Sequence, residues 1–129
     1  MNVPDDLKYT ADHEWARQKP DRVVVGVTDF AQDQLGDVVY VELPAVGDEV
    51  RKGESFGVVE STKAVSELFA PISGKVVEVN DPLVEAPEAV NEDPYEEGWM
   101  IAIAPSDPKE LVELLDAKAY AALVAEKND

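Results

Sequence analysis

Residues 46–80 read VGDEVRKGESFGVVESTKAVSELFAPISGKVVEVN, and the fold expected for the whole chain follows from this stretch. It contains two runs rich in β-branched and aromatic residues, 55–60 and 65–70, on either side of residues 61–64 (STKA). Two such runs so close together predict antiparallel strands joined by a tight turn. Because the turn lacks glycine and asparagine, we expect ordinary right-handed dihedrals in it rather than the positive φ of a primed turn. Lys63 is therefore predicted at the apex of a hairpin.

Lys63 is also isolated from other basic residues. No other lysine or arginine occurs between Lys52 and Lys75, whereas Glu60 and Glu67 lie on either side of it. A lysine at a hairpin tip is, taken alone, simply a solubilising charge. The motifs around it decide whether it is more than that.

Short segments bounded by Gly, Pro and Asp predict further strands at residues 23–27, 38–43, 75–79 and 99–104. Several of these are apolar at consecutive positions, which is typical of strands covered on both faces in a sandwich or small barrel. A short helix is expected within residues 28–37, because Thr28 can cap its start and Gly36 can end it.

The carboxyl-terminal segment, about 107–127, is predicted to be helical. Asp107 offers an N-cap, followed by Pro108 at the first helical position, and Leu111, Leu114 and Leu115 form an apolar face. Asp116 is expected to cap a second, Ala-rich helix at 117–126 that carries Tyr120, Leu123 and Val124. Residues 81–97 hold no basic residue and no calcium-loop pattern, so we expect a solvated surface loop there.

The composition restricts the class of protein. A chain of 129 residues is enough for one ordinary domain, so we expect residues 1–129 to form a single domain. Eleven Lys and Arg against 28 Asp and Glu give a formal net charge of −17, which disfavours nucleic acid and anionic membrane surfaces as partners. The same excess of carboxylates either steers basic partners towards the protein or only keeps it soluble.

Motifs for independent catalysis are missing from the sequence. The chain has no cysteine, which removes disulfides, thiol nucleophiles and thiolate metal sites, and its one histidine, His13, leaves few zinc geometries. There is no Gly-x-Ser-x-Gly elbow, no Gly-rich phosphate loop and no His-Glu-x-x-His motif. We therefore expect a structural role for His13, and any redox chemistry must come from an attached group.

Residues 46–80 resemble the biotinyl/lipoyl carrier domain, whose target lysine lies on a tight hairpin turn. The motifs that carry this resemblance are Gly47-Asp48-x-Val50-x-x-Gly53-Glu54, Val59-Glu60-Ser61-Thr62-Lys63-Ala64 and Pro71-x-Ser73-Gly74. Glu60 and Ala64 match the lipoyl type, whereas a biotinyl domain usually has Met on both sides of the lysine, where this chain has Thr62 and Ala64. Thr62 is a mild departure, since valine is expected there in many lipoyl carriers.

Outside this core the chain resembles the H-protein family of the glycine cleavage system. The resemblance covers nearly the whole chain, and its further motifs are Tyr9-Thr10-x-x-His13-Glu14-Trp15, Gly26-Val27-Thr28-Asp29-Phe30-Ala31-Gln32, Leu35-Gly36-Asp37-Val38-Val39, Val41-Glu42-Leu43-Pro44, Val90-Asn91-x-x-Pro94-Tyr95-x-x-Gly98-Trp99 and Leu114-Leu115. It implies a mainly β barrel-sandwich hybrid of the biotinyl/lipoyl carrier type, with a short internal helix and carboxyl-terminal helices packed on it.

The resemblance also implies a function. Lys63 would carry lipoate, whose dithiolane supplies the two sulfurs that the cysteine-free chain lacks, on a tether of roughly 14 Å. The protein would be a non-catalytic shuttle that accepts an aminomethyl group from glycine decarboxylase and presents it to an aminomethyltransferase. Dihydrolipoyl dehydrogenase would reoxidise the arm, and lipoate-attaching enzymes would load it.

Three other functions stay open beside the shuttle. The chain could be a relay that donates its lipoyl group to other lipoate-dependent enzymes, which only the cellular context separates from the shuttle. A biotin carrier is disfavoured by Thr62 and Ala64, and a binding module with unmodified Lys63 is disfavoured by the breadth of the motifs.

Two carboxylates are candidates for holding the loaded arm. An exposed aminomethyl adduct decomposes in water, so the arm gains by folding onto a surface with carboxylates and little water. Glu14, in the Tyr9–Trp15 motif outside the carrier core, is the first candidate, and Glu67 is the second; the alternative is that both are ordinary surface carboxylates. With no signal peptide or transit peptide at its start, the chain is expected to be a monomer in the bacterial cytoplasm, or in the mitochondrial matrix if it is a mature organellar chain.

Overall fold

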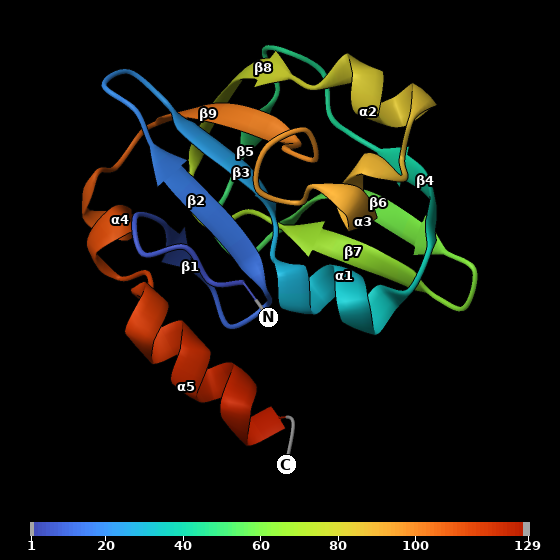
Figure 1. Ribbon diagram of the computed structural model, residues 1–129. Helices are drawn as coiled ribbons and strands as arrows, with labels where there is room; N and C mark the ends of the chain where they lie inside the picture. The colour runs from blue at the N-terminus through green and yellow to red at the C-terminus, as the bar shows by residue number, and fades with distance from the viewer. Residues whose placement is uncertain (1, 128–129) are drawn as a thin grey trace.

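The computed structural model describes residues 2–127 (Figure 1). These residues form two antiparallel β-sheets with five helices around them. The first sheet has six strands in the spatial order β1 (Lys8–Tyr9), β2 (Glu14–Gln18), β3 (Val23–Val27), β9 (Ile101–Pro105), β8 (Gly74–Val79) and β5 (Glu49–Val50). The second has three strands in the order β4 (Val38–Glu42), β6 (Ser55–Ser61) and β7 (Val65–Phe69). The helices are α1 (Asp29–Leu35), α2 (Asp81–Glu85), α3 (Ala89–Glu92), α4 (Lys109–Val112) and α5 (Ala117–Lys127).

The main core lies between the two sheets. Val41 and Val59 of the three-stranded sheet are 1% exposed, and Val25 and Ile103 of the six-stranded sheet are fully buried in the same cluster. Consecutive residues of β3 and β9 are buried, as expected for strands covered on both faces. The six predicted strands and the mainly β class are therefore confirmed.

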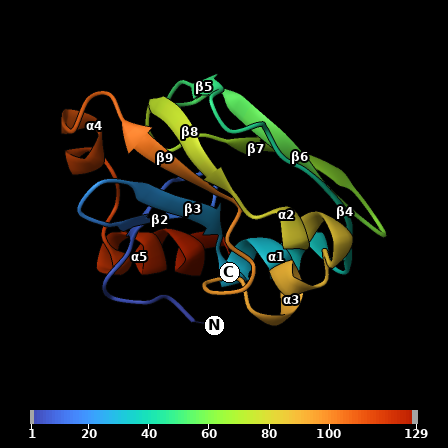
Figure 2. The same cartoon turned by 90° about the horizontal axis from the view of Figure 1, so that it is seen from above.

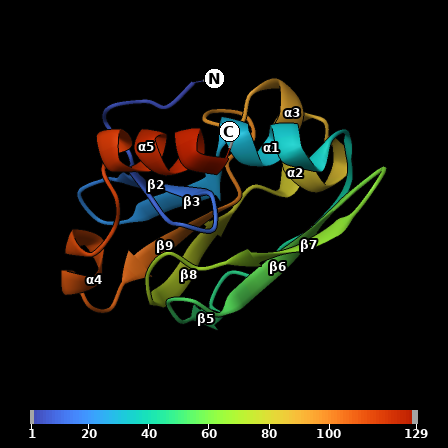
Figure 3. The same cartoon turned by 90° about the horizontal axis from the view of Figure 1, so that it is seen from below.

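A second apolar cluster lies on the other face of the six-stranded sheet. Tyr9, Trp15 and Tyr120 are fully buried there, and the rings of Tyr9 and Tyr120 stack at 4.6 Å. Figures 2 and 3 show α5 along β2, on the side away from β6 and β7. This cluster fastens the carboxyl-terminal helix to the β body.

The predicted caps hold both ends of α1. The hydroxyl of Thr28 accepts a hydrogen bond from the backbone N–H of Ala31, and Gly36 ends the helix with φ +80°. The carboxyl-terminal prediction is partly right: Asp116 accepts from the N–H of Ala119 at the start of α5. However, α4 ends at Val112, so Leu114 and Leu115 lie beyond the helix on which they were expected.

The expected surface loop at 81–97 is wrong. This segment contains α2 and α3, with Leu83 1% exposed and Val90 fully buried. The side chain of Asn91 accepts from the N–H of Val38 at 2.8 Å and donates to the carbonyl of Gly36 at 2.8 Å. Helices this short depend on such tertiary contacts rather than on propensity, so their local sequence carries little signal. Among the residues described, no helix is long and apolar enough to cross a membrane.

Candidate functional site

The loop between β6 and β7 presents Lys63 as predicted. Glu60 of β6 pairs with Val65 of β7, and the N–H of Ser61 donates to the carbonyl of Ala64 at 2.8 Å. The hydroxyl of Ser61 accepts from the N–H groups of Lys63 and Ala64, at 3.3 and 3.1 Å, so it stabilises the turn. No residue of this turn has a positive φ, which confirms its expected right-handed dihedrals. The hairpin projects from one end of the molecule (Figures 2 and 3).

The amine of Lys63 is accessible. Its side chain is exposed, and within the described part of the chain its Nζ takes part in no hydrogen bond or ion pair. The aliphatic part lies over Gly36, where an added Cβ would be 3.4 Å from Lys63 Cε. The N–H of Thr62 donates to the carbonyl of Asp37 at 3.0 Å, which ties the hairpin to the end of α1. The lysine is thus held in place at its backbone while its amine is free to react.

A cleft of about 180 Å³ lies between α1, the β1–β2 connection and the three-stranded sheet. Its lining includes both carboxylates singled out in the sequence, Glu14 and Glu67, together with Leu35, the residue before Gly36. The other lining residues are Asp12, His13, Val27, Ala31, Gln34, Val59, Ser66 and Leu68. The structure therefore places Glu14 and Glu67 in the wall of one cleft. Gly36, over which the Lys63 side chain lies, directly follows Leu35 of that wall.

Glu14 is buried at the inner wall of this cleft. It is 2% exposed; its Oε1 accepts from the Thr10 hydroxyl at 2.6 Å and its Oε2 accepts from the N–H of Phe69 at 3.3 Å. Burial raises the pKa of Glu14 to about 8, although these two hydrogen bonds act in the opposite direction. The cleft wall therefore carries a largely neutral carboxyl at neutral pH.

Glu67 and Asp12 differ from Glu14 in being exposed. Asp12, Gln34 and Ser66 also line the cleft and were not predicted from the sequence. Only the closeness of Asp12 to Glu14 in the sequence hinted at a shared site, and nothing local marked Gln34 or Ser66. The cleft thus combines one buried carboxyl with two exposed ones.

His13 has the structural role expected for it. Its φ is 71°, a left-handed conformation at the connection into β2, and its Nδ1 lies 2.8 Å from the hydroxyl of Tyr120. That hydroxyl is also 2.7 Å from the hydroxyl of Thr28, which caps α1. These contacts connect the cleft wall to α5.

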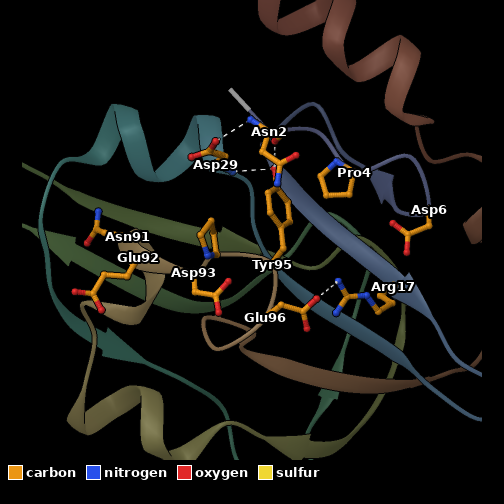
Figure 4. Close-up of a pocket in the computed structure, with 11 residues that line it drawn as sticks. Asn2, Pro4, Asp6, Arg17, Asp29, Asn91, Glu92, Asp93, Tyr95 and Glu96 are labelled. Atoms are coloured by element: carbon orange, nitrogen blue, oxygen red, sulfur yellow. Dashed lines mark hydrogen bonds and ion pairs between the residues drawn. The ribbon is translucent and has the colours of Figure 1, made fainter.

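A separate cavity of about 410 Å³ shares no residue with this cleft (Figure 4). Three of its five carboxylates have partners: Glu96 pairs with Arg17 at 3.3 Å, Asp29 accepts from the backbone N–H of Asn2 at 2.8 Å, and Asp93 accepts from the N–H of Glu97 at 3.3 Å. No group of His, Asp and Glu side chains within residues 2–126 has the arrangement of a metal site. The exposed amine of Lys63, together with the cleft lined by Glu14 and Glu67, is therefore the candidate functional site.

Comparison with known proteins shows which family the chain belongs to. The family model described as "Glycine cleavage H-protein" matches residues 7–127. The chain belongs to the glycine cleavage H-protein family. The H-protein of Anaeromyxobacter sp. (strain K) is 75% identical over 128 residues, 99% of this chain and 100% of its own. That of Myxococcus xanthus is 62% identical over 123 residues, 95% of each chain.

A solved structure supports the fold as well. The crystal structure of a glycine cleavage system H protein from Mycobacterium marinum matches with a TM-score of 0.89 and 46% identity, over 95% of this chain and 99% of that one. The expected carrier fold is confirmed by this match. The matches also confirm the expected function of an H-protein, the lipoyl-carrying shuttle of the glycine cleavage system. They do not favour the alternative of a lipoyl relay.

Proposed function

We propose that Lys63 is the attachment site for lipoate in this H-protein and that the chain is a carrier with no catalytic activity of its own. The observation that supports this most strongly is the exposed amine of Lys63 at the apex of a projecting hairpin, with no hydrogen bond or ion pair to any described residue. By comparison, Lys52 forms an ion pair with Glu113 at 2.8 Å. When attached, the lipoyl group supplies the dithiol chemistry that carries an aminomethyl unit.

The enzymes served by this carrier would be glycine decarboxylase, an aminomethyltransferase and dihydrolipoyl dehydrogenase, with a lipoate-attaching enzyme loading Lys63. We place the chain, acting as one domain and as a monomer, in the bacterial cytoplasm, in keeping with its bacterial relatives. A projecting hairpin suits this role because one amine must enter several active sites in turn.

The proposed role of the cleft is to shelter the loaded end of the arm. Val27, Leu35 and Val59 provide apolar wall that excludes water, while Glu14 and Glu67 provide oxygen acceptors for an amine. The two carboxyls differ in position. Glu67 lies at the rim, where its exposed side chain shares the outer face of β7 with Val65, whereas Glu14 is the buried partner at the inner wall.

The protonation state of Glu14 lets the cleft distinguish a cationic arm from an uncharged one. Burial raises the pKa of Glu14 to about 8, so the neutral form avoids the cost of a buried, unpaired charge. A cationic amine beside the carboxyl favours its ionised form, and Glu14 then releases its proton and forms an ion pair. An uncharged arm gains no such interaction, so the cleft would favour the loaded arm over the empty one.

The experiment that tests this function maps acylation by mass. The protein is incubated with a lipoate–protein ligase, lipoate and ATP, and its peptides are analysed. We expect one lipoyl increment, on Lys63, and none in Lys63→Arg, which keeps the charge but removes the nucleophile. Lys52→Arg and Lys75→Arg are the matched controls and should be modified like the parent. Modification at another lysine, or aminomethyl acceptance by the Lys63→Arg variant, would overturn the proposal.

A further inference from the structure

The outer face of the three-stranded sheet exposes apolar side chains next to the Lys63 hairpin. Tyr40 of β4 pairs with Glu60 of β6, which in turn pairs with Val65 of β7, so these three residues form one row across the sheet. Tyr40 is 43% exposed and Val65 is 66% exposed. Directly opposed residues on adjacent strands point to the same face, so the row forms a continuous surface. Val65 is only two residues from Lys63.

A β-bulge enlarges this apolar surface. Val38 pairs with Ser61 and Tyr40 with Glu60, so Val39 is an extra residue on β4. Without the bulge, strict alternation would turn either Val39 or Tyr40 inwards. With it, both point outwards, with Val39 55% exposed, while Val38 and Val41 on either side remain buried. Bulges re-aim side chains in this way beside functional sites.

The charges around the surface indicate what it can contact. Glu60 lies within the row, and Glu42 lies further along β4 on the same face. The strands β4, β6 and β7 contain no lysine or arginine. We call Val39, Tyr40, Val65, Glu42 and Glu60 the hairpin platform. Glu60 separates the apolar side chains of Tyr40 and Val65, so the surface mixes apolar and acidic groups and is complementary to a patch that combines apolar side chains with Lys or Arg.

We propose that the hairpin platform is the docking surface for the enzyme that acylates Lys63, which would present a patch that combines apolar and basic side chains. This inference rests on the proposed function, because it takes Lys63 as the acylated residue. The lysine side chain reaches only about 6 Å from its Cα. An enzyme that forms a bond to Nζ must therefore enclose the hairpin tip and contact the strands beside it. Enzymes that act on the far end of the arm work up to roughly 14 Å from the backbone, about 8 Å beyond Nζ, and need no such contact.

The test measures acylation kinetics with a lipoate–protein ligase, lipoate and ATP, with the H-protein as the varied substrate. The variant Tyr40→Thr/Val65→Thr removes the apolar area but keeps good strand formers. We expect its KM to rise about tenfold with kcat within about twofold, since docking is weakened while the hairpin still presents Lys63. Glu60→Lys should raise KM as well, by repelling the basic side chains of the enzyme.

The matched control is Val46→Thr/Val112→Thr, because these valines are 63% and 85% exposed. Val112 lies on α4, at the opposite end of the molecule from the hairpin (Figure 2). The control should keep the parental KM, and circular dichroism should be the same for all variants. A parental KM in the platform variant, or an equal rise in the control, overturns the docking proposal alone.

Two further outcomes are distinguishable. If the parent itself is not acylated at Lys63, the proposed function fails, and this inference fails with it. If the platform variant is acylated normally but shows a raised KM with glycine decarboxylase, the platform serves a different enzyme and the proposal is overturned.

Discussion

The carboxyl of Glu14 accepts a hydrogen bond of 3.3 Å from the backbone N–H of Phe69, which joins β2 of the six-stranded sheet to β7 of the three-stranded sheet. Phe69 ends the strand that leads back from the Lys63 hairpin. A buried acid therefore links the two sheets at the wall of the cleft. Its protonation couples the stability of the fold to pH.

The first prediction concerns that coupling. Burial raises the pKa of Glu14 from 4.5 to about 8, so between these values the folded chain holds a proton that the unfolded chain has lost. The contribution of Glu14 to stability should therefore fall as pH rises from about 4.5, and level off above about 8. Glu14→Gln keeps the shape of the side chain without its charge, so its free energy of unfolding should not show this fall. At pH 9 the effect on the free energy of unfolding of the parent, relative to this variant, should be on the order of 3 kcal/mol.

Urea denaturation of parent and variant from pH 5 to pH 9 measures this difference. The net charge of −17 adds its own pH dependence, so the readout is the difference between the two curves. Glu67→Gln is the control, because Glu67 is exposed. Parallel curves for parent and Glu14→Gln would contradict the prediction.

The second prediction concerns the loaded arm. If Glu14 and Glu67 shelter it, the double variant Glu14→Ala/Glu67→Ala should be lipoylated normally but release ammonia and formaldehyde faster once loaded, by about tenfold. Release is followed without the aminomethyltransferase, so that decay alone is measured. Glu85→Ala, which changes an exposed carboxylate on α2, is the control. Decay at the parental rate in both single variants and the double variant would remove these carboxyls from the role.

The third prediction concerns the position of the lysine. The hydroxyl of Ser61 accepts hydrogen bonds from the N–H groups of Lys63 and Ala64, so the backbone of the turn is fixed and each of its side chains leaves in a different direction. In Lys63→Ala/Ala64→Lys the lysine moves by one place, and its acylation rate should fall about 100-fold, because small misplacements of a reacting group are costly. The rate is measured by intact mass with the ligase. Acylation as fast as in the parent would show that the geometry of the turn is not what the enzyme recognises.

The fourth prediction concerns the contact between α5 and the cleft wall. Tyr120 is fully buried, and its hydroxyl lies 2.7 Å from that of Thr28 and 2.8 Å from His13 Nδ1. Burial raises the pKa of Tyr120 to about 12, so the hydroxyl keeps its proton at neutral pH. Tyr120→Phe should lower the free energy of unfolding by about 1–2 kcal/mol.

Tyr40→Phe, which removes a hydroxyl from a half-exposed ring, should change the free energy of unfolding by less than about 0.5 kcal/mol. Both values come from urea denaturation at pH 7. An equal effect of the two substitutions would mean that the buried hydroxyl is not a stabilising contact.

The sequence by itself determined the features that depend on neighbours along the chain. Two β-rich runs around residues 61–64 were enough to predict the hairpin and the place of Lys63 in it. Thr28 and Gly36 marked the two ends of α1 because a cap side chain and a left-handed glycine act within a few residues. Six of the seven described strands longer than four residues were predicted, since their apolar runs are visible in the sequence, but β2 (Glu14–Gln18) has no such run and was missed.

Only the tertiary structure decided the features that depend on contacts far apart in the chain. The two-residue strands β1 and β5 and the short helices in 81–97 have almost no local signal, and they form where buried side chains such as Val90 pack. The sequence named Glu14 and Glu67 but could not distinguish them. Glu14 is buried, with a raised pKa, because β7 and Thr10 close around it, whereas Glu67 stays in solvent. Burial and pKa depend on what the rest of the chain places around a side chain, so they are decided by the fold and not by the local sequence.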